Sequence, residues 1–191
     1  MAEADISGTG MRKINKINKI TIDYMPAEDR FRATTLLEDG SGLVMWLTQK
    51  MLNKLVSGLV GVFEERLAVP ETQVDAKPIS QRETRVAAQF WRQAEADLTI
   101  QGAARAEVKE GESPQVLIDG MRLRQHHDTY FLHFAWGQQS VYLPADETWL
   151  RQFMRILYRR YREAEWSTAG VWPVWFDTAA QRNYVKQTDI N

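Results

Sequence analysis

The three histidines of this 191-residue chain lie in one ten-residue stretch, RQHHDTYFLH, which also contains an aspartate. Imidazole and carboxylate groups are common metal ligands, and they often act as general acids and bases in enzymes. If His126, His127 and Asp128 converge in a loop, they form a candidate metal site or the acid/base site of an enzyme. A zinc site would need three or four ligands that point at one ion.

A tight turn would separate the same residues. Suppose that the two-residue turn of a β-hairpin consists of His127 and Asp128. The turn then fixes the register of the two strands: opposite residues pair from His126 and Thr129, next to the turn, to Met121 and Phe134. This register gathers apolar side chains on one surface, as a buried sheet face requires: Met121, Leu123, Tyr130, Leu132 and Phe134. The other surface carries Arg122, Arg124, His126, Phe131 and His133.

The hairpin register argues against metal binding. His126 and His133 share the polar surface but lie about 13 Å apart, at about 3.3 Å per residue, so they cannot bind one ion. His133 also faces Arg122, whose charge disfavours a cation. We therefore predict a turn with solvated histidines, no metal ligands, no catalytic residues and no cofactor. A longer loop at His127 would leave the enzyme alternative open.

Other chemical signatures are missing from the sequence. It has no cysteine, which excludes disulfides, thiol nucleophiles and thiolate metal sites. It also has no G-x-S-x-G elbow to expose a serine nucleophile. Neither the G-x-G-x-x-G nor the G-x-x-x-x-G-K-[ST] pattern of nucleotide-binding loops occurs.

Four arginines on a predicted helix over residues 145–166 form a candidate contact surface. They recur at i, i+4, i+8 and i+11, which at 100° per residue gives a ridge about 80° wide. This arginine ridge, Arg151, Arg155, Arg159 and Arg162, suits phosphate groups or an acidic partner, and a solvated face is the alternative. Because the net charge is −1 and the pI is near 6.3, a nucleic-acid surface would have to be a local patch.

Large apolar residues crowd the end of the same helix and the segment that follows it. Such side chains need burial, either against the domain's own sheet or against a second copy or another protein. Tryptophan is a favoured residue in protein contacts. The candidate interaction residues are Trp149, Ile156, Trp166, Trp172, Trp175 and Phe176.

Periodicity and turn signals predict the strands that surround these residues. Alternating and β-branched residues indicate a strand within 13–25 and a hairpin within 29–48 around the glycines of DGSG. A second group of strands is predicted within 116–144, and it includes the histidine hairpin.

Two further helices are predicted between the strand groups. Thr48 is a candidate N-cap for a helix over 49–67. Ser80 and Glu83 form a capping-box pattern ahead of a helix over 81–98. The apolar residues of that second helix form one stripe: Val86, Ala87, Phe90, Trp91, Ala94 and Leu98.

The composition and the order of elements predict an α+β fold. Hydrophobic residues make up 44% and charged residues 26% of the chain, as in globular proteins. We expect an antiparallel β-sheet or sandwich of about six or seven strands, with an inserted helix pair and a C-terminal helix. Residues 1–11 are expected to be disordered, residues 12–166 to form a single α+β domain, and residues 167–191 to form an aromatic-containing tail.

The predicted element order over about residues 13–166 resembles the head domain of the eukaryotic non-homologous end-joining scaffold proteins. The resemblance implies a β-sandwich head with an inserted helical pair, dimerisation through the following helix, and scaffolding of DNA-end complexes without catalysis. This chain departs from the pattern because Ser167, Gly170 and Pro173 stand where a long heptad-bearing stalk would continue. The segments WLTQK and REAEW are also similar to a small uncharacterised bacterial family.

These features together predict a non-enzymatic, cytoplasmic protein-interaction or scaffold domain that acts as a homodimer through its C-terminal helix and aromatic tail. One alternative is a nucleic-acid-associated protein that uses the arginine ridge, and another is an enzyme with a His/Asp loop. The sequence start lacks the apolar core of a secretory signal, and no apolar stretch is long enough for a membrane span. A membrane partner is therefore not expected.

Overall fold

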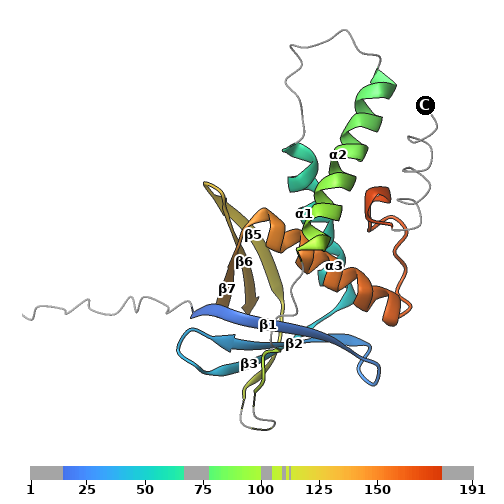
Figure 1. The fold of residues 1–191 in the computed structure, drawn as a ribbon. Coiled ribbons are helices and arrows are strands. Elements are labelled where there is room, and N and C mark those ends of the chain that lie inside the picture. The colour runs from blue at the N-terminus through green and yellow to red at the C-terminus, as the bar shows by residue number, and fades with distance from the viewer. Residues whose placement is uncertain (1–14, 67–77, 100–104, 109–110, 112, 178–191) are drawn as a thin grey trace, which may run out of the picture.

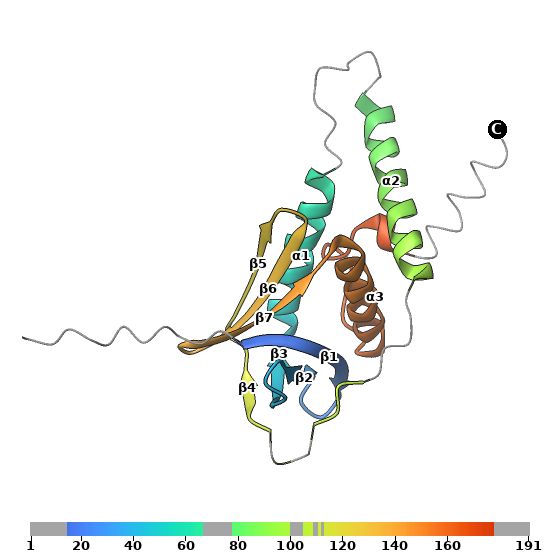
Figure 2. The ribbon, with the colours of Figure 1, turned by 60° about the vertical axis from the view of Figure 1, so that its left-hand side comes forward.

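The computed structural model of the protein describes residues 15–66, 78–99, 105–108, 111 and 113–177. In this part of the chain, seven strands form one curled sheet, the first and third α-helices pack against the sheet, and the second α-helix packs on the other two and on a short 3₁₀ helix (Figures 1 and 2). The layout is a half-barrel whose concave side faces the helices. None of the described helices is long and apolar enough to cross a membrane.

The elements alternate between two strand groups and the helices, which confirms the predicted α+β class with a helix pair between the groups. In chain order the strands are β1 (Asn15–Met25), β2 (Arg30–Leu37), β3 (Gly42–Leu47), β4 (Gln115–Leu117), β5 (Gly120–His126), β6 (Thr129–Trp136) and β7 (Gln139–Ala145). The helices are α1 (Gln49–Glu65), α2 (Pro78–Leu98) and α3 (Glu147–Glu163), followed by the short 3₁₀ helix η1 (Val174–Phe176).

The sheet is mixed, so the prediction of an antiparallel sheet or sandwich is wrong in this respect. The strand order is β4-β3-β2-β1-β7-β6-β5. Four neighbouring pairs are antiparallel, whereas β1 pairs with β7 and β3 pairs with β4 in parallel. Both parallel pairs join strands from different groups. Hairpin signals in the sequence report only neighbours along the chain, and therefore they miss these two pairs.

Two segments produce the curl. β1 pairs with β7 only at Asn15 and Lys16 and with β2 along the rest of its length, with an irregular register between Ile17 and Lys19. Near the opposite edges, the Ile118 amide donates to Trp46 of β3 at 3.1 Å, and the next amide donates to β6. Residues 118 and 119 thus link strands from both halves of the sheet. The strands therefore form one curled sheet and not a sandwich of two separate sheets.

Local turn and cap signals correctly predict the first hairpin and the first helix. Gly40 has φ +81° in the turn between β2 and β3, a conformation that glycine adopts without strain. Thr48 caps α1, because its side-chain oxygen accepts from the Met51 amide at 3.4 Å. The buried residues of α1 line one face: Leu52, Leu55, Val56, Leu59 and Phe63.

α2 differs from its prediction in both its start and its buried face. The helix begins at Pro78, so Ser80 lies inside it and the predicted capping box is wrong. Proline suits the first helical turn, where its missing amide hydrogen is not needed. The predicted apolar stripe packs only in part: Val86 and Phe90 lie half-buried against the core, whereas Trp91 and Leu98 are 68% and 88% exposed. Among the side chains of α2 that the structure describes, from residue 83 onward, the buried ones are Gln89, Gln93 and Ala96.

The core extends past the expected domain boundary at residue 166. Trp175 and Phe176 of η1 are buried in the same cluster as residues of the sheet, α1 and α3. The described part of the predicted tail therefore belongs to the domain. The predicted disordered residues 1–11 and the end of the tail, 178–191, lie outside the described residues.

A residue with a left-handed backbone follows the end of α3. Glu165 has φ +55°. Its amide donates to Arg162 O at 3.3 Å, and the Trp166 amide donates to Tyr161 O at 3.0 Å. This is the Schellman pattern, in which glycine usually takes the left-handed position. The turn places Trp166 on Phe31, with the stacked rings 4.7 Å apart between centroids.

Replacing Glu165 with glycine should stabilise the protein, because glycine adopts a positive φ without the steric cost of a Cβ atom. We expect the free energy of unfolding, measured by urea denaturation, to rise by about 1 kcal/mol. Arg159→Gly, an exposed position inside α3, is the control and should lose about 1 kcal/mol. Equal losses in both variants would contradict the assignment of strain to Glu165.

Candidate functional site

The histidine segment forms the predicted tight hairpin. β5 and β6 pair in the expected register, from His126 opposite Thr129 to Met121 opposite Phe134. His127, the first turn residue, has φ +52°. The predicted apolar surface faces the core, and its β6 members are fully buried: Tyr130, Leu132 and Phe134.

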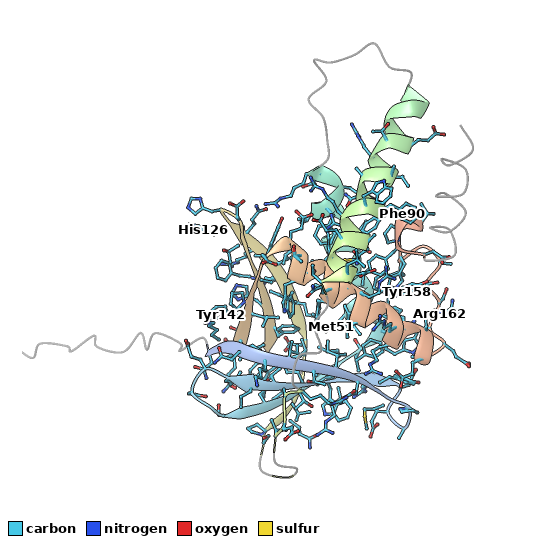
Figure 3. The ribbon with its side chains drawn as sticks, in the orientation of Figure 1. Met51, Phe90, His126, Tyr142, Tyr158 and Arg162 are labelled. Atoms are coloured by element: carbon cyan, nitrogen blue, oxygen red, sulfur yellow. The ribbon has the colours of Figure 1, made fainter. Side chains whose placement is uncertain are left out.

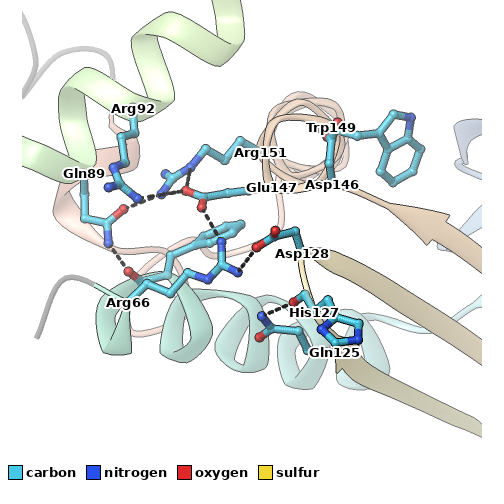
Figure 4. Close-up of polar contacts among 11 residues, drawn as sticks. Arg66, Gln89, Arg92, Gln125, His127, Asp128, Asp146, Glu147, Trp149 and Arg151 are labelled. Carbon is cyan, nitrogen blue, oxygen red and sulfur yellow. Dashed lines mark hydrogen bonds and ion pairs between the residues drawn. The ribbon is translucent and has the colours of Figure 1, made fainter.

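This turn directs the histidine and aspartate side chains to different places. The Asp128 carboxylate lies 3.8 Å from Nη2 of Arg66, and Figure 4 shows the His127 ring turned away from it. Within the described ranges, no group of three or more His, Cys, Asp or Glu side chains is arranged to hold a metal ion. The longer loop on which the enzyme alternative depends is replaced here by a two-residue turn.

The predicted arginine ridge is split by packing. Arg151 and Arg155 are 2% and 4% exposed, whereas Arg159 and Arg162 are exposed. α2 and η1 cover the first two guanidinium groups, which helical spacing alone does not reveal. Arg159 and Arg162 are therefore surface cations, whereas Arg151 and Arg155 are internal residues.

Arg151 lies between polar partners and an aromatic ring. Its Nε donates to Glu147 Oε1 at 2.9 Å, and its Nη2 donates to Gln89 Oε1 at 2.7 Å. The guanidinium carbon lies 4.2 Å from the centre of the Phe63 ring, a cation–π contact. Gln89 also donates to the carbonyl oxygen of Phe63. Burial lowers the pKa of Arg151, and the hydrogen bond to Glu147 opposes this effect.

Arg155 repeats the arrangement one turn later. Its Nε donates to Asp97 Oδ2 at 2.8 Å, and its guanidinium lies 4.4 Å from the centre of the Phe176 ring. Gln93 connects the two arginine sites, because its amide nitrogen donates both to Asp97 at 2.9 Å and to the carbonyl oxygen of Arg151 at 3.2 Å. These contacts join α2, α3 and η1 through polar groups.

Glu147 collects three guanidinium groups at the start of α3 (Figure 4). Besides Arg151, it pairs with Arg66 at 3.0 Å and with Arg92 at 3.4 Å. Burial raises the pKa of Glu147, but the hydrogen bonds and charges of these arginines outweigh it and lower the pKa overall. A carboxylate held in this way stays ionised and is a poor proton acceptor. Its role is to tie α1, α2 and α3 together.

The six predicted interaction residues pack mostly within the chain. Trp149 stacks on Phe153 with ring centroids 5.1 Å apart, and Tyr158 contacts Trp172 at 5.0 Å. Three of the six are buried: Trp166, Trp175 and Phe176. Two more, Trp149 and Trp172, are half-buried, and Ile156 is 39% exposed. Of the two alternatives that the sequence left open, folding back onto the domain accounts for most of these side chains.

The most exposed large apolar residues of α2 lie elsewhere on the molecule. Trp91 and Leu98 stand with Ala87 and Ala94 in a line along the helix, at spacings of four, three and four residues. We call these four residues the α2 seam. The sequence does indicate these four residues, because all of them belong to the apolar stripe that its periodicity predicts. Apolar periodicity alone does not show which part of the stripe is covered, because it does not tell an inward face from an outward one.

Replacing Arg151 with methionine should destabilise the protein, because it leaves the buried Gln89 and the carboxylate of Glu147 without their main partner. We expect a loss of about 3 kcal/mol in the free energy of unfolding, measured by urea denaturation. Arg159→Met, on the exposed part of the same helix, should change it by less than about 0.5 kcal/mol. Similar effects of both substitutions would contradict the internal role of Arg151.

The lowered pKa of Glu147 predicts a pH dependence of stability. The unfolded state, with a glutamate pKa of about 4.3, takes up a proton before the folded state does. The contribution of Glu147 is therefore complete above that value and is lost as the pH falls through its lower folded-state pKa. Glu147→Gln should flatten the dependence of the urea midpoint on pH between about 5 and about 3. Glu28→Gln, in an exposed turn, should leave the wild-type dependence unchanged, and a flattening in both would contradict the assignment.

Comparisons with protein families, with curated proteins and with solved structures give no match. The resemblance to the end-joining scaffold heads therefore stays a prediction. The surfaces of the chain itself carry the functional inference.

Proposed function

We propose that this protein is a non-enzymatic cytoplasmic interaction domain that acts as a homodimer through the α2 seam. The observation that carries the proposal is the exposure of Trp91 and Leu98, at 68% and 88%, in one line on one helix. Large apolar side chains that are exposed on one surface are typical of protein contacts. Tryptophan in particular contributes strongly when it is buried at an interface.

The seam faces away from the domain. At 100° per residue, Trp91 and Leu98 lie about 170° around the helix from the centre of the buried face, which is formed by Gln89, Gln93 and Ala96. One face of α2 is therefore held by the arginine network while the opposite face meets solvent. A helix that is fixed in this way is preorganised, so less conformational entropy is lost when a partner binds.

The spacing of the seam favours a second copy as the partner. Because the spacing of four, three and four residues reads the same in both directions, two antiparallel seams match along their length. In that pairing Trp91 lies against Ala94 of the other copy, and Leu98 lies against its Ala87. Each large side chain thus meets a small one, as close helix packing requires, and a twofold axis relates the two contacts.

The other predictions fit this proposal to different degrees. The absence of cysteine from the sequence suits a reducing cytoplasm. The nucleic-acid alternative through the arginine ridge is weakened, because Arg151 and Arg155 are internal. The contact surface moves from the aromatic tail, which the sequence suggested, to α2. A scaffold role would then depend on the symmetric dimer and not on a stalk.

Trp91→Glu and Leu98→Glu should convert the dimer into a monomer, because each places a charge in the paired seam. The molar mass in solution, from size-exclusion chromatography with light scattering, measures this change. Val174→Glu is the matched control, because Val174 is as exposed as Trp91 but lies on η1. It should remain a dimer, and circular dichroism should show all three variants folded.

A wild-type protein that stays monomeric at high concentration would contradict the proposal. A folded Trp91→Glu variant that stays dimeric would also contradict it, and would move the interface away from α2.

A further inference from the structure

The outer face of strands β5, β6 and β7 carries arginine and aromatic side chains in register. Along these strands the alternate residues Leu132 and Leu143 point into the core, so their neighbours point outward. Strand pairing arranges the outward residues in two rows. One row is Arg124, Phe131 and Pro144, and the other is Arg122, His133 and Tyr142, extended by Lys16 of β1. We call these seven residues the outer sheet face.

The rings of this face form one continuous aromatic surface. Tyr142 lies 6.0 Å from Phe131 and 5.9 Å from His133 between ring centroids. All three side chains are half-buried, so each ring is supported from below and still reaches solvent. Figure 3 shows Tyr142 on the side of the strands that faces away from the helices. Exposed rings on a sheet are stacking platforms for unpaired bases.

The charges of the face are all positive. Arg122 and Arg124 are exposed on the edge strand, and Lys16 lies at the other end, 3.8 Å from the exposed Glu38. Burial lowers the pKa of His133, and the charges of Arg124 and Arg122 lower it further. Its ring is therefore neutral near pH 7 and adds stacking surface. Neither row contains an acidic residue, although the net charge of the whole chain is −1.

We infer that the outer sheet face binds single-stranded nucleic acid, with bases stacked on Tyr142 and Phe131 and phosphates held by Arg122 and Arg124. A duplex does not fit the same surface, because its bases are stacked on one another at about 3.4 Å and present no free ring faces. The rings here are about 6 Å apart, which suits bases that have been spread apart. The phosphate contacts do not select a sequence.

This surface is distinct from the α2 seam. Figure 2 shows α2 and the β5–β7 strands on opposite sides of the molecule, with α1 and α3 between them. A dimer formed through α2 would thus carry two outer sheet faces that are both open. Binding to nucleic acid and dimerisation are therefore separable, and the monomeric Trp91→Glu variant should still bind each strand.

Fluorescence anisotropy with labelled oligo-dT and oligo-U of about 16 nucleotides tests the inference, with a blunt DNA duplex as competitor. Tyr142→Ala should weaken binding between about 5-fold and about 100-fold, as expected when one base loses its stacking partner. Tyr142→Phe keeps the ring and should retain binding. Arg122→Ala with Arg124→Ala should weaken binding and reduce the slope of log affinity against log salt by about 1.4, for two lost phosphate contacts.

The matched control is Arg159→Ala with Arg162→Ala, which removes the same charge from exposed positions on α3. It should leave both the affinity and the salt slope near the wild-type values. Binding of oligo-U alone would assign the site to RNA through its 2′-hydroxyl groups, and equal binding of both oligonucleotides would assign it to either nucleic acid.

Three results would overturn the inference: no binding of either oligonucleotide at low salt, equal competition by the duplex, or an equal loss of affinity in the α3 control. The last result would show that net charge, and not the outer sheet face, attracts the strand.

Discussion

Two guanidinium groups buried among helices are the constraint on which the rest of the structure depends. Removing Arg151 and Arg155 from water is costly unless acceptors pair with the two guanidinium groups. Glu147, Asp97 and Gln89 supply those acceptors from α2 and α3, so a small shift of either helix would leave a buried charge unpaired. The network explains why α2 buries Gln89 and Gln93 on one face, while Trp91 and Leu98 remain outside on the other.

Features encoded by neighbouring residues could be predicted from the sequence. The register around His127 follows from a two-residue turn and from the need to bury one face, and the structure reproduces it pair by pair. Thr48 was recognisable as a cap for the same reason, since its partner is three residues away. From that register, four residues of the outer sheet face were already known to share a surface: Arg122, Arg124, Phe131 and His133.

Features that depend on distant partners could not be predicted. Arg155 and Asp97 are 58 residues apart, and no periodicity indicates that they meet. A pattern-based reading treats arginine and glutamine as solvent-facing, so it predicts that the whole ridge lies on the surface, and it does not show which residues of the stripe with Trp91 are covered. Tyr142 joins the outer sheet face only through the pairing of β7 with β6. Each of these errors concerns which face of a correctly predicted element is covered.

Strand β1 pairs with strands of both groups, and this pairing has a consequence for the order of folding. The hairpins β2–β3, β5–β6 and β6–β7 connect close neighbours and close short loops. The pairing of Asn15 with Val141 instead closes a loop of most of the chain, and such contacts are slow to form. During synthesis, the first strand group must wait for β7 before the sheet is complete. The half-barrel therefore closes as a late event of the whole chain, and its two strand groups are the natural candidates for earlier folding units.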